Sequence, residues 1–150
     1  PYVPMEAPMY LKGKSRRGPS FREAILMHSV SRIAFKGLIN NIQTSWVKMG
    51  QEGVQACLNA GANDIGGTLM NESITRAAGA DHGQEWHPQG IEETIISMGR
   101  KPKMRTTSYD EAPQSRRELA FRASTLTQIE NTAAAKLQRS KKLDNIAQVL

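Results

Sequence analysis

A strand–helix–strand pattern over residues 41–70 constrains the fold more than any other feature. Two short segments of strand character, residues 42–48 and 62–66, flank a helix-length piece with apolar residues at helical spacing. Gly61 falls where a residue of left-handed conformation would close that helix. Because an intervening helix returns the chain to the same end of a sheet, the pattern predicts parallel strands and an α/β fold.

Both predicted strands are unusually polar. Parallel strands that are covered on both faces normally read as runs of Val, Ile and Leu. These strands instead carry Gln43, Thr44, Ser45, Lys48, Asn63 and Asp64. Each such side chain needs a partner when buried, and polar groups at the ends of parallel strands are typical of a ligand site.

Gly66-Gly67, followed by Thr68, precedes a predicted helix over residues 71–78. Glycines before a helix let the backbone approach a ligand, and the exposed amides there suit an anion. A plain tight turn fits the same residues. Their position beyond a predicted strand favours the ligand site, since ligands of parallel α/β folds gather beyond the carboxyl ends of the strands.

The residues before this unit predict one more strand and one more helix. Residues 1–11 alternate proline with apolar residues, which permits a short or terminal strand. Ser20 and Glu23 form a capping box that starts a helix extending to about residue 38. Its apolar stripe is Leu26, Met27, Val30, Ile33, Ala34 and Leu38, and its polar stripe is His28, Arg32 and Lys36. The polar stripe is interpreted as solvated, so His28 is not read as a catalytic base.

The second half predicts helices and a basic tail. A short helix is expected over residues 91–98 and an extended segment over 105–109. A second capping box, Ser115 with Glu118, predicts a long amphipathic helix in a tail over residues 114–150. We expect this tail to be separate from a domain over residues 1–113. It carries seven Lys or Arg against three Asp or Glu, but lacks the interleaved aromatic residues of a single-strand binder.

Composition narrows the class of protein. The net charge of +6 is diffuse and favours anionic partners only in principle. No apolar run approaches the ~18 residues of a membrane span, so a soluble protein in a reducing compartment, cytoplasm or organelle stroma, is expected. The single cysteine, Cys57, gives no metal motif and falls on an apolar helix stripe as a core residue. His82, Trp86 and His87 lack the spacing of the well-known zinc motifs.

Two long motifs in register resemble a known family. They are Gln-Thr-Ser-Trp-Val-Lys-Met-Gly over residues 43–50 and Gly-Ala-Asn-Asp-Ile-Gly-Gly-Thr-Leu-Met over residues 61–70. Together with Arg-Thr-Thr over residues 105–107 they resemble the C-terminal part of the FO synthase family. The match is to the radical S-adenosylmethionine (SAM) half, which joins tyrosine to 5-amino-6-(D-ribitylamino)uracil. Related menaquinone-pathway radical SAM enzymes carry a similar second motif.

The resemblance implies a (β/α)8 TIM-type barrel of which this chain holds about strands six to eight. Strand six is expected near residues 2–5. It also implies a [4Fe-4S] cluster held by a Cys-x3-Cys-x2-Cys loop that this chain lacks, so we expect a piece of a longer protein. In the intact enzyme, SAM cleavage gives a radical that starts the transfer of a 4-hydroxybenzyl group from tyrosine to the uracil.

The resemblance and the polar strands together give a set of predicted substrate-binding residues. They are Gln43, Ser45, Trp46, Lys48, Asn63, Asp64, Gly66, Gly67 and Thr68. Either alternate set of the first strand, 43/45/47 or 44/46/48, is open as the lining of the barrel. The expected partners are the two small-molecule substrates, the remainder of the barrel and the companion FO-synthase half. The competing hypotheses are a basic, non-catalytic α/β binding module and a degenerate scaffold.

Overall fold

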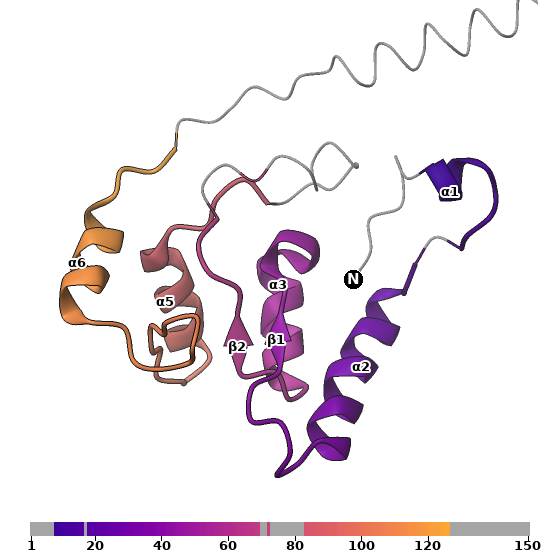
Figure 1. The fold of residues 1–150 in the computed structure, drawn as a ribbon, viewed down its shortest axis with the longest axis horizontal. Coiled ribbons are helices and arrows are strands. Elements are labelled where there is room, and N and C mark those ends of the chain that lie inside the picture. The colour runs from indigo at the N-terminus through magenta and orange to yellow at the C-terminus, as the bar shows by residue number, and fades with distance from the viewer. Residues whose placement is uncertain (1–7, 17, 70–71, 73–82, 127–150) are drawn as a thin grey trace, which may run out of the picture.

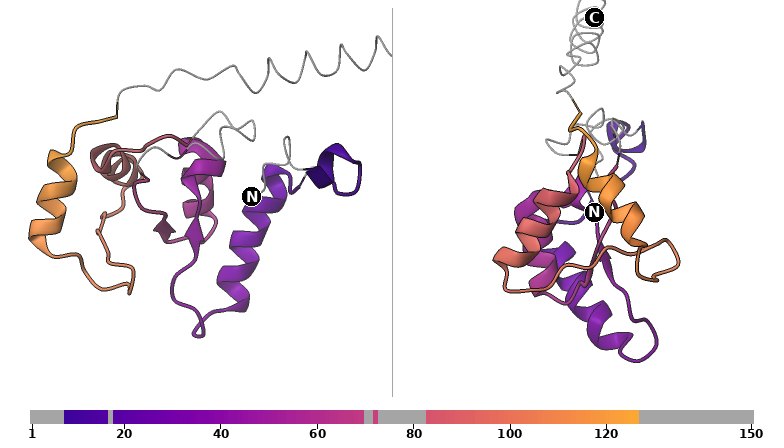
Figure 2. Two further views of the ribbon diagram at one scale, coloured as in Figure 1. Left: turned by 45° about the horizontal axis from the view of Figure 1, so that its top comes forward. Right: turned by 90° about the vertical axis from the view of Figure 1, so that its left-hand side faces the viewer.

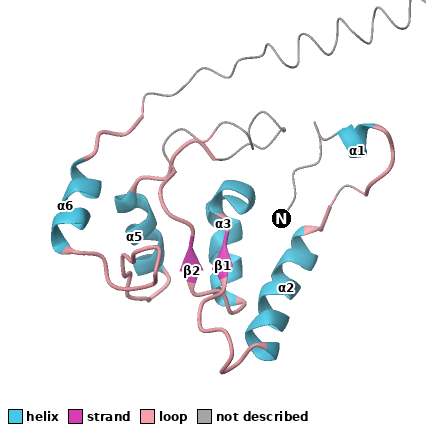
Figure 3. Cartoon of the chain, viewed as in Figure 1, coloured by secondary structure: helices cyan, strands magenta, loops and turns pink. Residues whose placement is uncertain are grey.

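The computed structural model describes residues 8–16, 18–69, 72 and 83–126. The elements are α1 (Pro8–Leu11), α2 (Phe21–Ala34), β1 (Gln43–Thr44), α3 (Trp46–Asn59), β2 (Asp64–Ile65), α5 (Pro88–Ser97) and α6 (Gln114–Arg122) (Figure 1). The two short strands lie side by side among helices (Figure 3). This mixture of helices with a small parallel sheet is compatible with the predicted α/β class.

The central strand–helix–strand unit is confirmed. β1 and β2 pair in parallel, with Gln43 opposite Asp64 and Thr44 opposite Ile65. The predicted closure of the intervening helix is also confirmed, because Gly61 has φ +116° directly after α3. A β-carbon at Gly61 would lie 2.8 Å from the Arg32 β-carbon. Glycine is therefore required there by both conformation and the close approach of α2.

The first predicted strand is shorter than expected. The sequence pattern predicts strand over residues 42–48, but Trp46 and Lys48 lie in the first turn of α3. Ser45 is the N-cap residue, and its carbonyl oxygen accepts hydrogen bonds from the amides of Lys48 and Met49 at 3.2 and 3.0 Å. Satisfying these amides in a helical turn ends the strand at Thr44. Gly50, with φ +66°, then separates this first turn from the rest of α3.

The core lies where α3 packs against both strands. Its buried members are Trp46, Val47, Val54, Cys57, Leu58 and Ala62. The prediction that Cys57 is a core residue is confirmed, since its side chain is fully buried and its thiol is free. The helical spacing of Val54, Cys57 and Leu58 therefore marked the face of α3 that covers the sheet.

Helix α2 begins as predicted, but packs with the opposite face. The capping box of Ser20 and Glu23 is present, and the helix ends at Ala34, earlier than residue 38. Two of the three residues expected to be solvated face the domain instead: Arg32 donates from Nε to the Gly61 carbonyl oxygen at 2.8 Å, and His28 is half-buried. Lys36, beyond the end of the helix, is exposed as predicted. The expected apolar stripe is exposed, at Leu26, Met27, Val30, Ile33, Ala34 and Leu38. Hydrogen bonds of Arg32 to the loop before β2, together with the packing of Ala24 and Ile25, hold this face against the domain.

The start of α2 should depend on pH through Glu23. Hydrogen bonds from the Ser20 backbone and side chain, and then from Arg16, hold the pKa of Glu23 below its usual value. A lowered folded-state pKa contributes stability that is present at neutral pH and is lost as the pH falls through that pKa. We expect the first turn of α2 to fray below about pH 4.5. Amide exchange at Glu23 would measure this, and Glu23→Gln should remove the pH dependence.

Other predicted elements differ at their boundaries. The predicted strand over residues 1–11 is helical in its last part, where α1 lies, and residues 1–7 are outside the described part. The helix predicted over residues 71–78 also falls outside it, apart from residue 72, which is not helical. The helix predicted over 91–98 begins earlier, as α5, because Pro88 takes the first helical position and the His87 side chain accepts from the Gln89 amide.

The C-terminal region forms a tight turn and a short helix. The sequence predicts an extended segment over residues 105–109, but these residues form part of a turn closed by an isolated bridge between Arg105 and Glu111. The second capping box is wrong: Pro113 is the N-cap of α6, without a side-chain bond, and the helix ends at Arg122. Helices α1 and α6 lie at opposite ends of the arrangement (Figure 2). Among the described helices, none is long and apolar enough to cross a membrane.

Candidate functional site

The two-stranded sheet has one face covered by α3 and one that we call the open face. Thr44 and Ile65 are register partners on the covered face, where Thr44 is fully buried and Ile65 packs on the core. Gln43 and Asp64, the other pair, therefore share the open face. Of the two alternate sets left open by the sequence, the strand places Gln43 on the open face and Thr44 on the face covered by α3. The Thr44 hydroxyl has no hydrogen-bond partner among the described residues.

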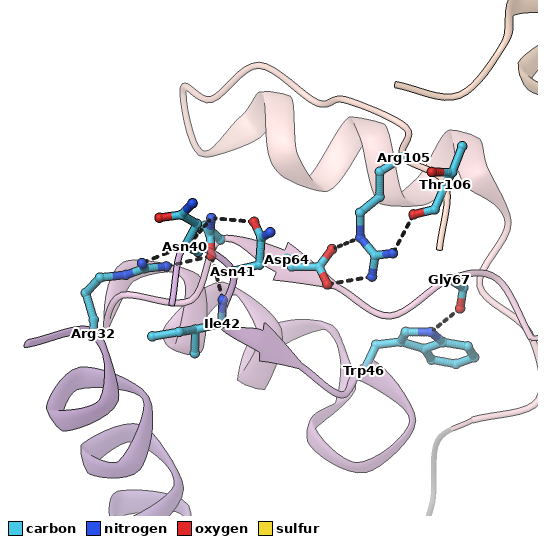
Figure 4. Close-up of polar contacts among 10 residues, drawn as sticks. Arg32, Asn40, Asn41, Ile42, Trp46, Asp64, Gly67, Arg105 and Thr106 are labelled. Atoms are coloured by element: carbon cyan, nitrogen blue, oxygen red, sulfur yellow. Dashed lines mark hydrogen bonds and ion pairs between the residues drawn. The ribbon is translucent and has the colours of Figure 1, made fainter. Parts of the chain in front are cut away.

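Asp64 is held by an arginine from a distant segment. Arg105 Nε donates to Asp64 Oδ1 at 2.7 Å, and Arg105 Nη2 donates to Asp64 Oδ2 at 2.6 Å (Figure 4). The hydrogen bond to Asp64 is the main reason that the pKa of Arg105 is raised above its usual value. The structure thus brings together one predicted site residue and one residue that had no predicted role.

The Asn63 side chain holds the loop that leads into β1 through several hydrogen bonds. Its Oδ1 accepts from Arg32 Nη2 at 2.6 Å and from the Ile42 amide at 2.9 Å. Its Nδ2 donates to the Asn40 carbonyl oxygen at 3.1 Å and to Asn41 Oδ1 at 3.4 Å. The side chain of this predicted site residue is therefore engaged by the loop between α2 and β1.

Trp46 supports the glycine segment beyond β2. The residue is 4% exposed, and its indole Nε1 donates to the Gly67 carbonyl oxygen at 3.1 Å. The Trp86 ring meets it edge-on, with ring centroids 6.0 Å apart. A β-carbon at Gly66 would lie 3.4 Å from Gln43 Nε2. The Gln43 side chain thus reaches Gly66, which follows the carboxyl end of β2, and Trp46 contacts the next residue, Gly67.

Gly67 has no structural need to be glycine within the described part of the chain. Its φ is not positive, and a β-carbon there would meet nothing within 4 Å. A missing side chain at this position is compatible with close approach of a ligand to the backbone. Thr68 follows it and is exposed.

The other predicted site residues lie apart from this cluster. Lys48 is exposed on the first turn of α3, and Ser45 is the half-buried N-cap of that helix. Neither continues a strand wall as the sequence pattern predicted. His87 caps α5, and its Nε2 lies 3.2 Å from the Ala123 carbonyl oxygen, while His82 is outside the described residues.

The described residues offer no ligand set for the [4Fe-4S] cluster that the resemblance implies. The one cysteine, Cys57, is sealed in the apolar core and cannot join an iron–sulfur cluster without unpacking α3. Within the described ranges, no group of three or more His, Cys, Asp or Glu is placed to hold a metal ion. A cluster would have to be held by other parts of a complete protein.

Two residues of the site were missed by sequence reasoning. The helical pattern puts Arg32 on a solvated stripe, and Arg105 stands out only as part of a motif. Their partners are far along the chain: Arg32 bonds Asn63, 31 positions away, and Arg105 bonds Asp64, 41 positions away. The available signal was the presence of two arginines and of two adjacent polar residues, Asn63 and Asp64, in the strand predicted over residues 62–66. That signal has no local periodicity to reveal it.

The geometry defines an α/β protein with a parallel strand–helix–strand unit and a polar open face near a glycine segment. The chain belongs to the family described as the CofH/MqnC C-terminal region, which matches residues 9–118. That match covers both motifs and both strands. It includes Arg32 and Arg105 as well as the open face.

Curated relatives carry names from deazaflavin synthesis. The chain is 52% identical over 103 residues to a 5-amino-6-(D-ribitylamino)uracil--L-tyrosine 4-hydroxyphenyl transferase of Methanocaldococcus jannaschii, covering 69% of this chain and 29% of that protein. It is 48% identical to the Methanopyrus kandleri protein of the same name, covering 73% of this chain and 30% of that one. An FO synthase of Mycobacterium leprae is 45% identical, with 73% and 13% covered. No solved structure matches.

The chain thus spans less than a third of the length of these relatives. The family match over residues 9–118 includes the strand–helix–strand unit and the turn that carries Arg105. The named activities belong to proteins that are much longer than the matched segment.

Proposed function

We propose that this chain is part of a radical SAM enzyme of deazaflavin biosynthesis. The complete enzyme would transfer a 4-hydroxybenzyl group from tyrosine to 5-amino-6-(D-ribitylamino)uracil, giving the precursor of the deazaflavin FO. The observation that carries this proposal is the 52% identity to a protein named for the transfer between these two substrates. The family match over residues 9–118 supports it.

The same proposal places the chain in a (β/α)8 barrel. Parallel β1 and β2, joined by α3, form the unit from which such barrels are built. The exposed apolar stripe of α2 supports this placement, because Leu26, Val30 and Ile33 are 50%, 58% and 78% exposed. An exposed apolar stripe of this kind is typical of a surface that packs against another part of a protein. Earlier strands and helices of the barrel would bury it. Residues 1–113 would belong to the barrel domain and residues 114–150 to a tail.

The role proposed for this chain is on the substrate side. SAM and its [4Fe-4S] cluster, bound elsewhere in the complete enzyme, would supply the radical. Gln43 offers an amide donor and acceptor on the open face, and the backbone at Gly67 leaves room for a flat ring or a ribityl chain. Trp46 holds the Gly67 carbonyl in place from below. These groups would orient the substrate while the closed barrel excludes water.

Filling the space at Gly67 tests this role. In the complete, cofactor-loaded protein, Gly67→Leu should lower kcat/KM for the aminouracil about tenfold, mainly through KM, because the side chain would occupy the ligand's place. The thermal midpoint should change little, since a β-carbon at this exposed position meets nothing within 4 Å among the described residues. Steady-state kinetics with tyrosine and the aminouracil, together with thermal unfolding, measure both quantities.

Gly67→Ala is the matched control, and its smaller side chain should cause a smaller loss. Wild-type kinetics in Gly67→Leu would place the substrate elsewhere. A wild-type protein that forms no adduct from the two substrates would refute the proposed function itself.

A related menaquinone-pathway radical SAM enzyme is the second candidate. The family description joins both groups of proteins under one heading, and this observation favours keeping it. The aminouracil separates the two candidates. An enzyme of the first kind consumes it together with tyrosine, which mass spectrometry of the product would show.

A further inference from the structure

Arg105 projects from a turn that is ordered by its own hydrogen bonds. The Thr106 amide donates to the Asp110 carbonyl oxygen at 2.8 Å, and the Ala112 amide donates to the Met104 carbonyl oxygen at 3.0 Å. We call residues 104–112 the Arg105 turn. It follows α5 and precedes α6, so it lies between two helices in the chain.

The guanidinium is fixed on three sides. Besides the two bonds to Asp64, its Nη1 donates to the Thr106 carbonyl oxygen at 2.9 Å. The ring of Tyr109 lies 4.3 Å from the guanidinium carbon, which is a favourable cation–π distance. Tyr109 adopts φ +67°, a conformation that a non-glycine residue takes only when its surroundings impose it. The turn therefore presents Arg105 in one orientation.

The ion pair with Asp64 is shielded from water. The Asp64 side chain is 9% exposed and that of Arg105 is 27% exposed. By contrast, the ion pair of Lys103 with Glu111 on the same turn is 65% and 72% exposed. A bidentate, shielded pair is stronger and more directional than an exposed one. Asp64 is also the register partner of Gln43, so the guanidinium binds a side chain of the open face itself.

We infer that Arg105 is a positioning residue for the proposed site, which it serves by holding Asp64 and fixing β2 beside Gln43. This inference rests on the proposed function. Arg105 also neutralises the Asp64 carboxylate, so a ligand on the open face meets an amide and the glycine backbone instead of an unpaired negative charge. Asp64 then acts through the ion pair and does not itself touch the substrate.

Three variants of the complete, cofactor-loaded protein test the kinetic part. Arg105→Leu should raise KM for the aminouracil about tenfold and keep kcat within about threefold of wild type. The reason is that β2 would no longer be held beside Gln43 and the Asp64 carboxylate would be left without its counter-charge. Arg105→Lys keeps the positive charge but cannot form the bidentate pair with Asp64, so its increase in KM should be smaller than that of Arg105→Leu. The double variant Asp64→Leu/Arg105→Leu should return KM to within about threefold of wild type, since removing both partners leaves no unpaired charge.

If Asp64 contacts the substrate directly, the double variant will be at least as impaired as Arg105→Leu, and the inference is overturned. A wild-type KM in Arg105→Leu would overturn it as well. Lys103→Ala, which breaks the exposed ion pair on the same turn, is the matched control and should leave KM unchanged.

Amide hydrogen exchange separates this inference from the proposed function. In the protein without substrates, Arg105→Leu should speed exchange at the Thr106 and Ala112 amides, and also at Gly66 on the sheet, by about tenfold or more. Unchanged exchange at Gly66 would show that the turn does not hold β2 and would overturn the inference. An inactive wild-type protein would refute only the proposed chemistry, because the exchange result still decides whether Arg105 anchors the sheet.

Discussion

Gly83→Ala should destabilise the fold by about 3 kcal/mol. Gly83 has φ +104°, and a β-carbon there would lie 2.5 Å from Val47 Cγ1 and 3.2 Å from the Val47 carbonyl oxygen. Val47 is itself buried in the core, at 6% exposure. The substitution therefore combines backbone strain with a clash that the core cannot relieve cheaply. Chemical denaturation followed by circular dichroism would measure the loss.

Gly99→Ala is the control that separates strain from clash. Gly99 also has a positive φ, +70°, but a β-carbon there would meet nothing within 4 Å. We expect a loss of about 1 kcal/mol there, from backbone strain alone. Equal losses at Gly83 and Gly99 would mean that the contact between Gly83 and Val47 does not exist in solution.

Asn63→Ala should destabilise the sheet by about 2 kcal/mol. The substitution removes an acceptor for Arg32 and for the Ile42 amide, together with two donated hydrogen bonds to the loop before β1. Because this loop leads directly into β1, local exchange at Ile42 should increase along with global unfolding. Denaturation and amide exchange in the same variant would show both effects.

Asn63→Asp keeps the acceptor and loses the donors. Its loss of unfolding free energy should therefore be less than half of the loss in Asn63→Ala. Arg32→Ala should reproduce part of the Asn63→Ala effect, and the double variant should be less than additive, because the two side chains bond each other. An Asn63→Ala protein with wild-type stability but a raised KM would instead show that Asn63 contacts the substrate.

Local sequence signals predicted the centre of the fold well. The spacing of Val54, Cys57 and Leu58 marked the buried face of α3, and Gly61 marked its end. The capping box of Ser20 and Glu23 located the start of α2. Each of these signals is carried by residues within one or two turns of each other, so a short stretch of sequence contains the whole of the interaction.

Errors arose where a distant contact overrides a local preference. Trp46 and Val47 have high strand propensity, yet both enter α3 and pack in its core. The apolar stripe of α2 is real, but periodicity does not say which face meets α3. The bonds of Arg32 to Gly61 and Asn63 place the polar face there. No helical or strand period connects residues that are about 30 positions apart.

The candidate site shows the same division. The sequence located the polar neighbourhood at the ends of β1 and β2, and the structure groups Gln43, Gly66 and Gly67 there. It could not assign Asn63 and Asp64 their internal partners, because both partners are arginines from other segments. Polar residues on a strand are consistent with ligand binding and with long-range anchoring, and only the three-dimensional structure distinguishes the two.

The edge-on pair of Trp46 and Trp86 provides an intrinsic optical reporter. These are the two tryptophans of the chain, and the indole N–H of Trp46 is bonded to the Gly67 carbonyl. Movement of the glycine segment on ligand docking would change the polarity around that indole, and so its emission wavelength and intensity. A Trp86→Phe variant would leave one emitter in this chain, positioned to follow docking in real time without a label.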